Sequence, residues 1–405
     1  MGQTTSTTPT RFEALDGWRG ICACLVVLFH FHGFSPLYTS GLVRNSYLFV
    51  DFFFVLSGFV IAWNYGSRLD SWAGVKRFLL LRVGRVYPLH LFMLLCLVVY
   101  EFAKMARGPA AGAESTVFTG ATHPFAVVTN LLLVQSLNIH DGLTWNGPAW
   151  SISTELWAYV LFAMVSMWLG MRNWMLMLAA LLAPVLILHL SRTGMDTTYD
   201  YGLVRCVFGF ALGVACCRLH KAWPAIARGG PPAVMSVLEI AIVAVVAWYV
   251  STAGTGPWSI AAPFVFAVAV LIFAVEGGAV SRLFRFRFLT WLGTLSYSIY
   301  LTHYFFVLVF PAVVKRIVHQ DLWTPMQLAN GQYLLAFGRN DVEGTLFYAL
   351  VIAVTVAFSA FTYRWVETPG RDWTRRWVGP SKNGVKSAQR SSATGAATTP
   401  SSQRT

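Results

Sequence analysis

The chain has 405 residues, of which 56% are hydrophobic and only 12% are charged, and its mean hydropathy is +0.58. Soluble domains carry about 25% charged residues, so this composition excludes a large water-soluble core and indicates a protein embedded in lipid. The net charge of +13 does not indicate nucleic-acid binding, because the basic residues lie between apolar runs and form no basic stripe on a soluble module.

Ten apolar runs approach the roughly 17–25 residues that a helix needs to cross a bilayer. They lie near residues 19–36, 46–64, 86–105, 149–169, 172–190, 203–218, 233–250, 258–276, 294–315 and 345–364. A shorter run at 123–138 is interrupted by Thr129, Asn130 and Gln135, so it is either an interfacial or re-entrant helix or an eleventh span. The sequence therefore predicts an all-α, polytopic membrane bundle of about ten transmembrane helices.

Positive charge favours ten spans over eleven. With ten spans and a cytoplasmic N-terminus, most of the 30 lysines and arginines fall on the cytoplasmic side, whereas an eleventh span would place most of them outside. We therefore expect a multi-pass protein of the inner (plasma) membrane with both termini in the cytoplasm. The expected parts are a polar tail at 1–14, a transmembrane domain at 15–370 and a basic tail at 371–405, disordered from about residue 380.

The six cysteines all lie inside apolar runs, and none has metal-ligand spacing with histidines. They are therefore expected to be small core residues, with neither a disulfide framework nor a metal site.

Seven ionisable residues lie at membrane depth, where such residues mark either a function or a buried pair. They are His30, His32, Asp51, Glu155, Arg205, Glu239 and His303. Arg19 and His30 share a helix face, because eleven residues at about 100° each return to within about 20° of the start and rise about 16 Å. We expect Arg19 at the membrane surface and His30 near the midplane, with His32 on another face as a packing residue.

Arg82 and Arg85 are three residues apart and are neighbours on one helix face. With Lys76 and Arg77 they form a cationic mouth beside Arg19. Guanidinium groups bind phosphate bidentately, so this mouth suits a phosphate-bearing ligand. Ordinary anchoring by positive charge at the cytoplasmic surface explains the same residues, and both interpretations stay open.

Three further spans carry polar residues of interest. Asp51 lies near the outer start of its span, and Ser151 and Glu155 are i, i+4 neighbours on the helix that begins near 147, with Glu155 about two turns below the outer surface. Tyr300 and His303 are i, i+3 neighbours, and His303 reaches about the depth of His30. These residues fit an enzyme that works across the membrane, and they also fit a proton-coupled transporter or flippase.

Six stretches that follow one another along the chain resemble acyltransferase family 3, the bacterial membrane proteins that O-acetylate surface polysaccharides and related glycosides. They run from Leu15 to Pro369 and read LDGWRGICACLVVLFH, DFFFVLSGF, RVGRVYPLH, WSISTELWAY, LGTLSYSIYLTH and RWVETP. The resemblance implies a transfer of an acyl group, expected to be acetyl, from cytoplasmic acyl-CoA to a hydroxyl of an extracytoplasmic sugar or polysaccharide.

The resemblance also implies roles for individual residues. Arg19, Arg82 and Arg85 would bind the phosphates of acetyl-CoA or another acyl-CoA, which is a donor substrate and not a resident cofactor. The donor's flexible arm would thread inward and place the thioester beside His30, the general base, while Glu155 would orient the acceptor hydroxyl or fix the tautomer of the imidazole. Residues expected to contact substrate or support the site are Asp51, Ser151, Tyr300 and His303. The expected partners are the lipid bilayer, the acyl-CoA and the acceptor, with no nucleic acid, and the oligomeric state stays open.

Overall fold

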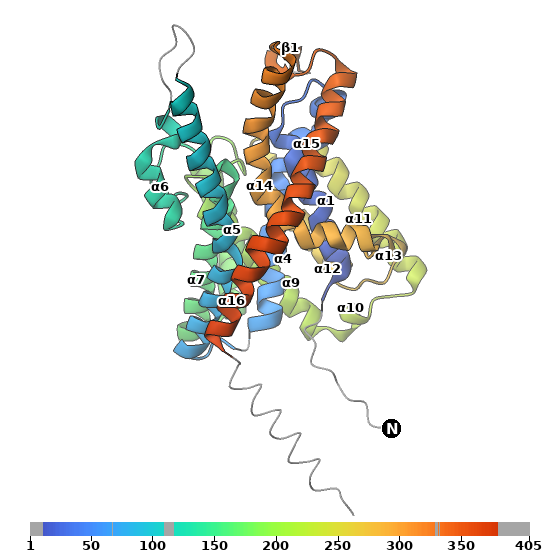
Figure 1. Cartoon of the computed structure of the whole chain (residues 1–405). Coiled ribbons are helices and arrows are strands. Elements are labelled where there is room, and N and C mark those ends of the chain that lie inside the picture. Colours follow the sequence, from blue (N-terminus) through green and yellow to red (C-terminus); the bar gives the residue numbers. More distant parts are fainter. Residues whose placement is uncertain (1–10, 67, 109–116, 329–330, 332, 380–405) are drawn as a thin grey trace, which may run out of the picture.

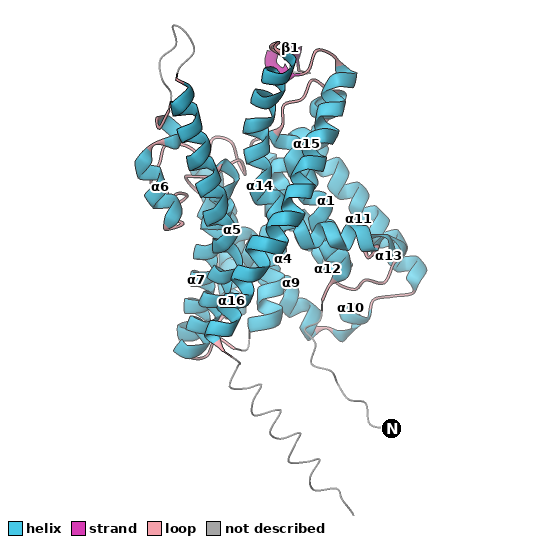
Figure 2. Ribbon diagram, in the orientation of Figure 1, coloured by secondary structure: helices cyan, strands magenta, loops and turns pink. Residues whose placement is uncertain are grey.

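Long apolar helices make up most of the computed structural model, and one short hairpin contains the named strands (Figure 2). The structure describes residues 11–66, 68–108, 117–328, 331 and 333–379. Eight helical segments in this part of the chain are long and apolar enough to cross a membrane. They contain η1 (Ser46–Leu48) with α4 (Phe49–Tyr65), α5 (Trp72–Arg107), η3 (Gly147–Ala149) with α7 (Trp150–Leu169), α8 (Asn173–Leu190), α9 (Gly202–Ala222), α11 (Pro232–Ala253), α14 (Arg287–Val318), and α15 (Asp341–Thr362) continued through the π-helical η5 (Tyr363–Glu367) into α16 (Thr368–Val378).

The two remaining predicted spans are also helical. One is α1 (Glu13–His30), whose first turns carry three charged residues, and the other is the shorter apolar segment formed by η4 (Pro257–Ala261) and α12 (Ala262–Phe273). The predicted all-α, polytopic membrane fold is therefore confirmed. The short connecting elements are α2 (Pro36–Thr39), α3 (Gly41–Arg44), η2 (Gly120–Thr122), α6 (Pro124–Leu131), α10 (Pro224–Arg228), α13 (Ala279–Phe284), and the antiparallel strands β1 (Trp323–Gln327) and β2 (Tyr333–Phe337).

The run at 123–138 does not form an eleventh span. Its only α-helix, α6, has 8 residues, which at 1.5 Å per residue rise about 12 Å. This length is too short for a hydrocarbon core of about 30 Å.

Helix α5 starts 14 residues earlier than the predicted span at 86–105 and is 36 residues long. The helix continues past the apolar run because arginine is a good helix former, and Arg82 and Arg85 therefore lie on a helix as predicted. The side chain of Ser71 caps the first turn by accepting from Gly74 N. Near this end, Arg77 Nη1 donates to Val378 O at 3.2 Å and to Gly379 O at 2.6 Å, which holds the end of α16 against α5.

The predicted tail at 371–405 begins as helix. Residues 371–378 belong to α16, whose Thr374 is buried. The part predicted to be disordered, from about residue 380, lies outside the described residues.

Glycines let several helix pairs pack at backbone distance. A Cβ atom on Gly293 of α14 would lie 1.9 Å from Asp16 O of α1, and one on Gly58 of α4 would lie 2.1 Å from Phe210 O of α9. Small residues allow such close approach between membrane helices. The α1–α14 contact matters for the site, because these two helices carry His30 and His303.

We call the end of the bundle where α1 begins and α16 ends the inner end, and the end with the β1–β2 hairpin the outer end (Figure 1). Both ends of the described chain lie at the inner end, since Arg11 and Arg375 line one cavity there. The described chain therefore begins and ends at the same end of the bundle.

One of the seven predicted ionisable residues has a purely structural set of partners. The buried carboxylate of Glu239 accepts from Gly278 N and Ser281 N, each at 2.8 Å, and from Ser281 Oγ at 2.5 Å. It therefore caps the N-terminus of α13. The six cysteines are free, and each is buried or half-buried.

Candidate functional site

Two cavities lie one above the other in the bundle. The inner cavity, of about 630 Å³, is lined by residues of the inner end, among them Arg11, Arg68 and Arg375. The outer cavity, of about 750 Å³, contains His30 and reaches Lys315 and Trp323 beside the hairpin. Val50 and Tyr300 line both cavities, so they lie where the cavities meet, and we call this pair of side chains the wall.

The inner cavity is strongly cationic. Six arginines line it, against two acidic residues, Asp16 and Glu155. The arginines come from separate parts of the chain and are Arg11, Arg19, Arg68, Arg82, Arg85 and Arg375. The structure therefore brings together the three predicted phosphate ligands, Arg19, Arg82 and Arg85.

Arg82 is held in place but is incompletely paired. Its Nη2 donates to Tyr65 Oη at 3.1 Å, and its guanidinium lies over the Tyr65 ring, 5.2 Å from the centroid. Its buried Nε has no hydrogen-bond partner among the described residues. A buried donor without a partner is costly, so this arginine is suited to an anionic ligand that supplies the missing acceptor.

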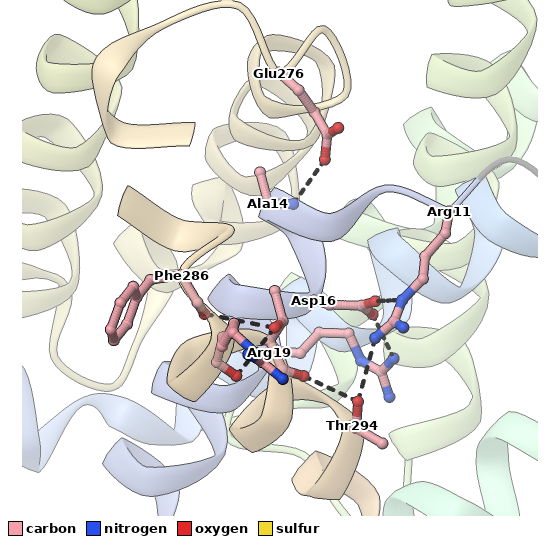
Figure 3. A network of polar contacts seen from close by, with 9 residues as sticks. Arg11, Ala14, Asp16, Arg19, Glu276, Phe286 and Thr294 are labelled. Atoms are coloured by element: carbon pink, nitrogen blue, oxygen red, sulfur yellow. Dashed lines mark hydrogen bonds and ion pairs between the residues drawn. The ribbon is translucent and has the colours of Figure 1, made fainter. Parts of the chain in front are cut away.

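Arg19 belongs to a small ionic network at the start of α1 (Figure 3). Asp16 accepts from Arg19 Nη1 at 3.3 Å and from Arg11 Nε at 2.6 Å, and Arg11 Nη2 also donates to Thr294 Oγ1 at 3.2 Å. Glu276 accepts from Ala14 N at 2.7 Å and so caps the same helix. Asp16 neutralises only part of the charge of the two arginines.

Glu155 faces the inner cavity, and the expectation that it lies on the outer side near His30 was wrong. It accepts from Tyr159 Oη at 2.5 Å, and Tyr159 Oη lies 2.8 Å from Ser57 Oγ. Because the Tyr159 hydroxyl donates its hydrogen bond to the carboxylate, it accepts a hydrogen bond from Ser57 Oγ. The physical reason for the misplacement is that residues 144–154 are buried, so α7 starts inside the protein and Glu155 lies deeper than a surface start would place it.

His30 is oriented by His303 and not by Glu155. His30 Nδ1 lies 2.9 Å from Val26 O and 3.2 Å from His303 Nε2. A carbonyl oxygen only accepts, so Nδ1 of His30 carries the proton, and Nε2 is left as the basic nitrogen of the neutral ring. His303 is fully buried, and its own Nδ1 lies 3.3 Å from Ile299 O, so its Nε2 is free to accept from His30.

The wall residue Tyr300 is fixed by two polar contacts. Its hydroxyl donates to Pro148 O at 3.0 Å and accepts from Ser151 Oγ at 2.9 Å. Ser151 also lines the inner cavity. The predicted supporting residues Ser151 and Tyr300 therefore meet, and they do so at the wall between the cavities.

Asp51 lies outside both linings and pairs with Arg205 in the protein interior. Arg205 Nε and Nη2 contact the two carboxylate oxygens of Asp51 at 2.9 and 2.8 Å, and both side chains are buried. Arg205 itself lines the outer cavity, so Asp51 acts there only by holding Arg205.

Aromatic rings and polar groups share the lining of the outer cavity. The rings include Tyr47, Trp150 and Tyr304. Asp196, in the loop before α9, also lines it; burial raises the pKa of this carboxyl, and the charge of Arg205 opposes the rise. His32, expected to be a packing residue, lines this cavity as well.

The predicted route of the acyl-CoA arm from the arginines to His30 therefore runs through two cavities that meet at Val50 and Tyr300. The sequence pointed to the arginine group and to His30, and it marked Arg205 as a charge at membrane depth without assigning it to a cavity. It missed Arg375 and Tyr159, which carry no such signal. Among the described residues, no group of three or more His, Cys, Asp or Glu side chains could hold a metal ion.

These features define a multi-pass membrane protein with an arginine-lined cavity at one end and a histidine-bearing cavity at the other. The chain belongs to acyltransferase family 3, whose acyltransferase domain it matches over residues 12–364. It is thus a membrane acyltransferase.

Several named proteins are similar to the chain. A Komagataeibacter xylinus protein named as membrane-bound transacylase BcsY is 25% identical over 90% of this chain and 84% of its own length. The peptidoglycan O-acetyltransferase OatA of Listeria monocytogenes is 24% identical over 92% of this chain, which spans 57% of that protein. Protein 2 in the picA locus of Rhizobium radiobacter is 34% identical over 38% of this chain and 82% of its own length. No solved structure is significantly similar to the chain.

Proposed function

We propose that this protein is an O-acyltransferase of the inner membrane that moves an acetyl group from cytoplasmic acetyl-CoA to a hydroxyl of an extracytoplasmic sugar or polysaccharide. The observation that carries the proposal is the pair of cavities, one lined by six arginines and the other by His30, that meet at Tyr300. The name of the similar OatA supports an acetyl group and a glycan acceptor.

The inner cavity is the donor site in this proposal. Acyl-CoA carries several negative charges at its nucleotide end and a thioester at the far end of a flexible arm. Guanidinium groups bind phosphates bidentately, which suits Arg19, Arg82 and Arg85 as ligands of the nucleotide end. The arm then points toward Tyr300 and carries the thioester away from the charged rim.

The outer cavity is the acceptor site. Its aromatic rings offer apolar faces to a sugar ring, and Arg205, Asp196 and Thr198 offer polar groups to its hydroxyls. A cavity with mostly apolar walls and a few placed polar groups is typical of small-molecule sites.

In the transfer step, the acceptor hydroxyl oxygen attacks the thioester carbonyl and gives its proton to His30 Nε2. The C–S bond then breaks, and the CoA sulfur leaves with that proton. While His30 is protonated, its Nδ1–H stays hydrogen-bonded to Val26 O and His303 Nε2, both of which accept. The acyl group has to pass Tyr300 to reach this position.

The experiment is acetyl transfer by the purified protein in lipid nanodiscs, with labelled acetyl-CoA and a soluble glycan acceptor. We expect label on the glycan and stoichiometric release of CoA, and we expect Arg82→Gln to raise the KM for acetyl-CoA. A proton-coupled transporter or flippase would instead move its substrate across a sealed vesicle without covalent change. Flux without any acetylated product would contradict the proposal.

A further inference from the structure

The arginines of the inner cavity fall into two tiers that differ in exposure. The side chain of Arg19 is 23% exposed, whereas those of Arg11 and Arg375 are 56% and 62% exposed. Arg82 and Arg85 belong with Arg19 to the floor, and Arg68, which is exposed, belongs with Arg11 and Arg375 to the rim. The proposed acyl-CoA site accounts for the floor and leaves the rim without a role.

The rim is assembled from three separate segments, which are the residues before α1, the loop between α4 and α5, and α16. Helix α16 is held there by Arg77, which donates to Val378 O and Gly379 O, and by the burial of Thr374 beside Arg375. Its other face exposes Trp373 and Trp377, whose rings stack 6.4 Å apart. Tryptophans of this kind favour the membrane–water interface, so α16 is suited to stay at the cavity entrance.

The ionic partners of the rim arginines neutralise only part of their charge. Arg375 Nη1 lies 3.6 Å from the exposed Asp372, a contact that contributes little in water. Arg11 shares Asp16 with Arg19. Positive charge in excess of its partners at a cavity entrance fits an anion, and a phosphate monoester carries close to two negative charges at neutral pH.

We propose that the rim, through Arg68 and Arg375 with Arg11, binds the 3′-phosphate of the acyl-CoA, while the floor binds the diphosphate. The inference rests on the proposed donor. It follows from the order of groups along that molecule, because the 3′-phosphate lies beyond the diphosphate as seen from the thioester. The rim is thereby a specificity determinant that selects CoA over carriers without a 3′-phosphate.

The test compares binding of CoA and 3′-dephospho-CoA to the purified full-length protein by calorimetry, and KM for the two acetyl thioesters. We expect the wild type to bind CoA about tenfold more tightly, and Arg68→Gln with Arg375→Gln to bring the two ligands within about twofold. Arg376→Gln is the matched control, because Arg376 is the next residue of α16 and does not line the cavity; this variant should keep the tenfold preference. Adenosine 3′,5′-bisphosphate should compete with CoA in the wild type and several-fold less well in the double variant.

Equal affinity of the wild type for CoA and 3′-dephospho-CoA would overturn the inference and leave the acyl-CoA donor intact. A tenfold preference that survives in the double variant would also overturn it. If neither CoA nor its dephospho form binds and neither thioester is consumed, the proposed donor is wrong and the rim assignment falls with it.

Discussion

His303 Nε2 lies 3.2 Å from His30 Nδ1, although 273 residues separate the two histidines in the sequence. The contact exists because Gly293 lets α14 approach the backbone of α1. His303 is fully buried, and its Nε2 accepts from His30 Nδ1. Nε2 of His30 is therefore the ring nitrogen of this pair that can accept a proton from a substrate.

His30→Gln should lower the turnover of acetyl transfer by about 10²–10⁴-fold, because the acceptor hydroxyl loses its general base. His303→Gln should lower it less and shift the pH profile of kcat, since His303 acts only through His30. The measurement is acetylated product per minute at several pH values. His189→Gln is the matched control: that histidine makes the same kind of contact, 2.8 Å from Val185 O, but lies outside both cavities. Wild-type turnover in His30→Gln would contradict the assignment of the base.

Tyr300→Ala should join the two cavities and let water reach the thioester. We expect acetyl-CoA hydrolysis in the absence of acceptor to rise at least severalfold, measured as free thiol released over time. Tyr300→Phe keeps the ring and should stay near the wild-type hydrolysis rate. Tyr304→Ala is the control, because Tyr304 lines the outer cavity alone. Unchanged hydrolysis in Tyr300→Ala would show that Tyr300 does not separate the chambers.

Asp51→Ala should destabilise the protein strongly, because it leaves the buried charge of Arg205 without its bidentate partner. Breaking a buried pair in this way costs about 3–5 kcal/mol. The readout is the thermal unfolding midpoint in detergent. Asp321→Ala removes one partner of the exposed pair with Lys315 and should leave the midpoint unchanged. Equal midpoints for both variants would refute the structural role of Asp51.

Gly293→Ala should unfold or loosen the α1–α14 pair, since the new Cβ would lie 1.9 Å from Asp16 O, a backbone atom that cannot rotate away. Overpacking of this kind costs about 1–3 kcal/mol, and more where backbones must separate. The expected result is a lower unfolding midpoint together with lost activity. Gly142→Ala, which meets nothing within 4 Å, is the control. A fully stable Gly293→Ala would contradict the described packing.

Features of the structure that depend on a local sequence pattern were predicted well. The ten apolar runs are helices, and Arg82 and Arg85 point into one cavity as their spacing of three residues indicates. Length, periodicity and charge are properties of one segment at a time, and each of these conclusions needed only one segment.

Features that depend on how segments are placed against one another were not predicted. Glu155 was placed on the outer side because the fold of residues 117–149, which buries the start of α7, has no local signature. The position of Val50 and Tyr300 between the two cavities depends on how α4 and α14 pack, and no local sequence pattern indicates that position. Arg375 reaches the cavity only because α16 docks on α5.

The partition formed by Val50 and Tyr300 bears on how the bilayer keeps its electrochemical gradient. We expect these two side chains to interrupt the column of water between the two chambers and so to limit the passage of protons and ions. A two-carbon fragment needs only a brief displacement of one aromatic ring to change compartments, whereas a long fatty chain would hold that ring aside. A variant with a smaller side chain at Tyr300 is therefore expected to accept longer acyl chains and also to let more protons and ions leak across the membrane.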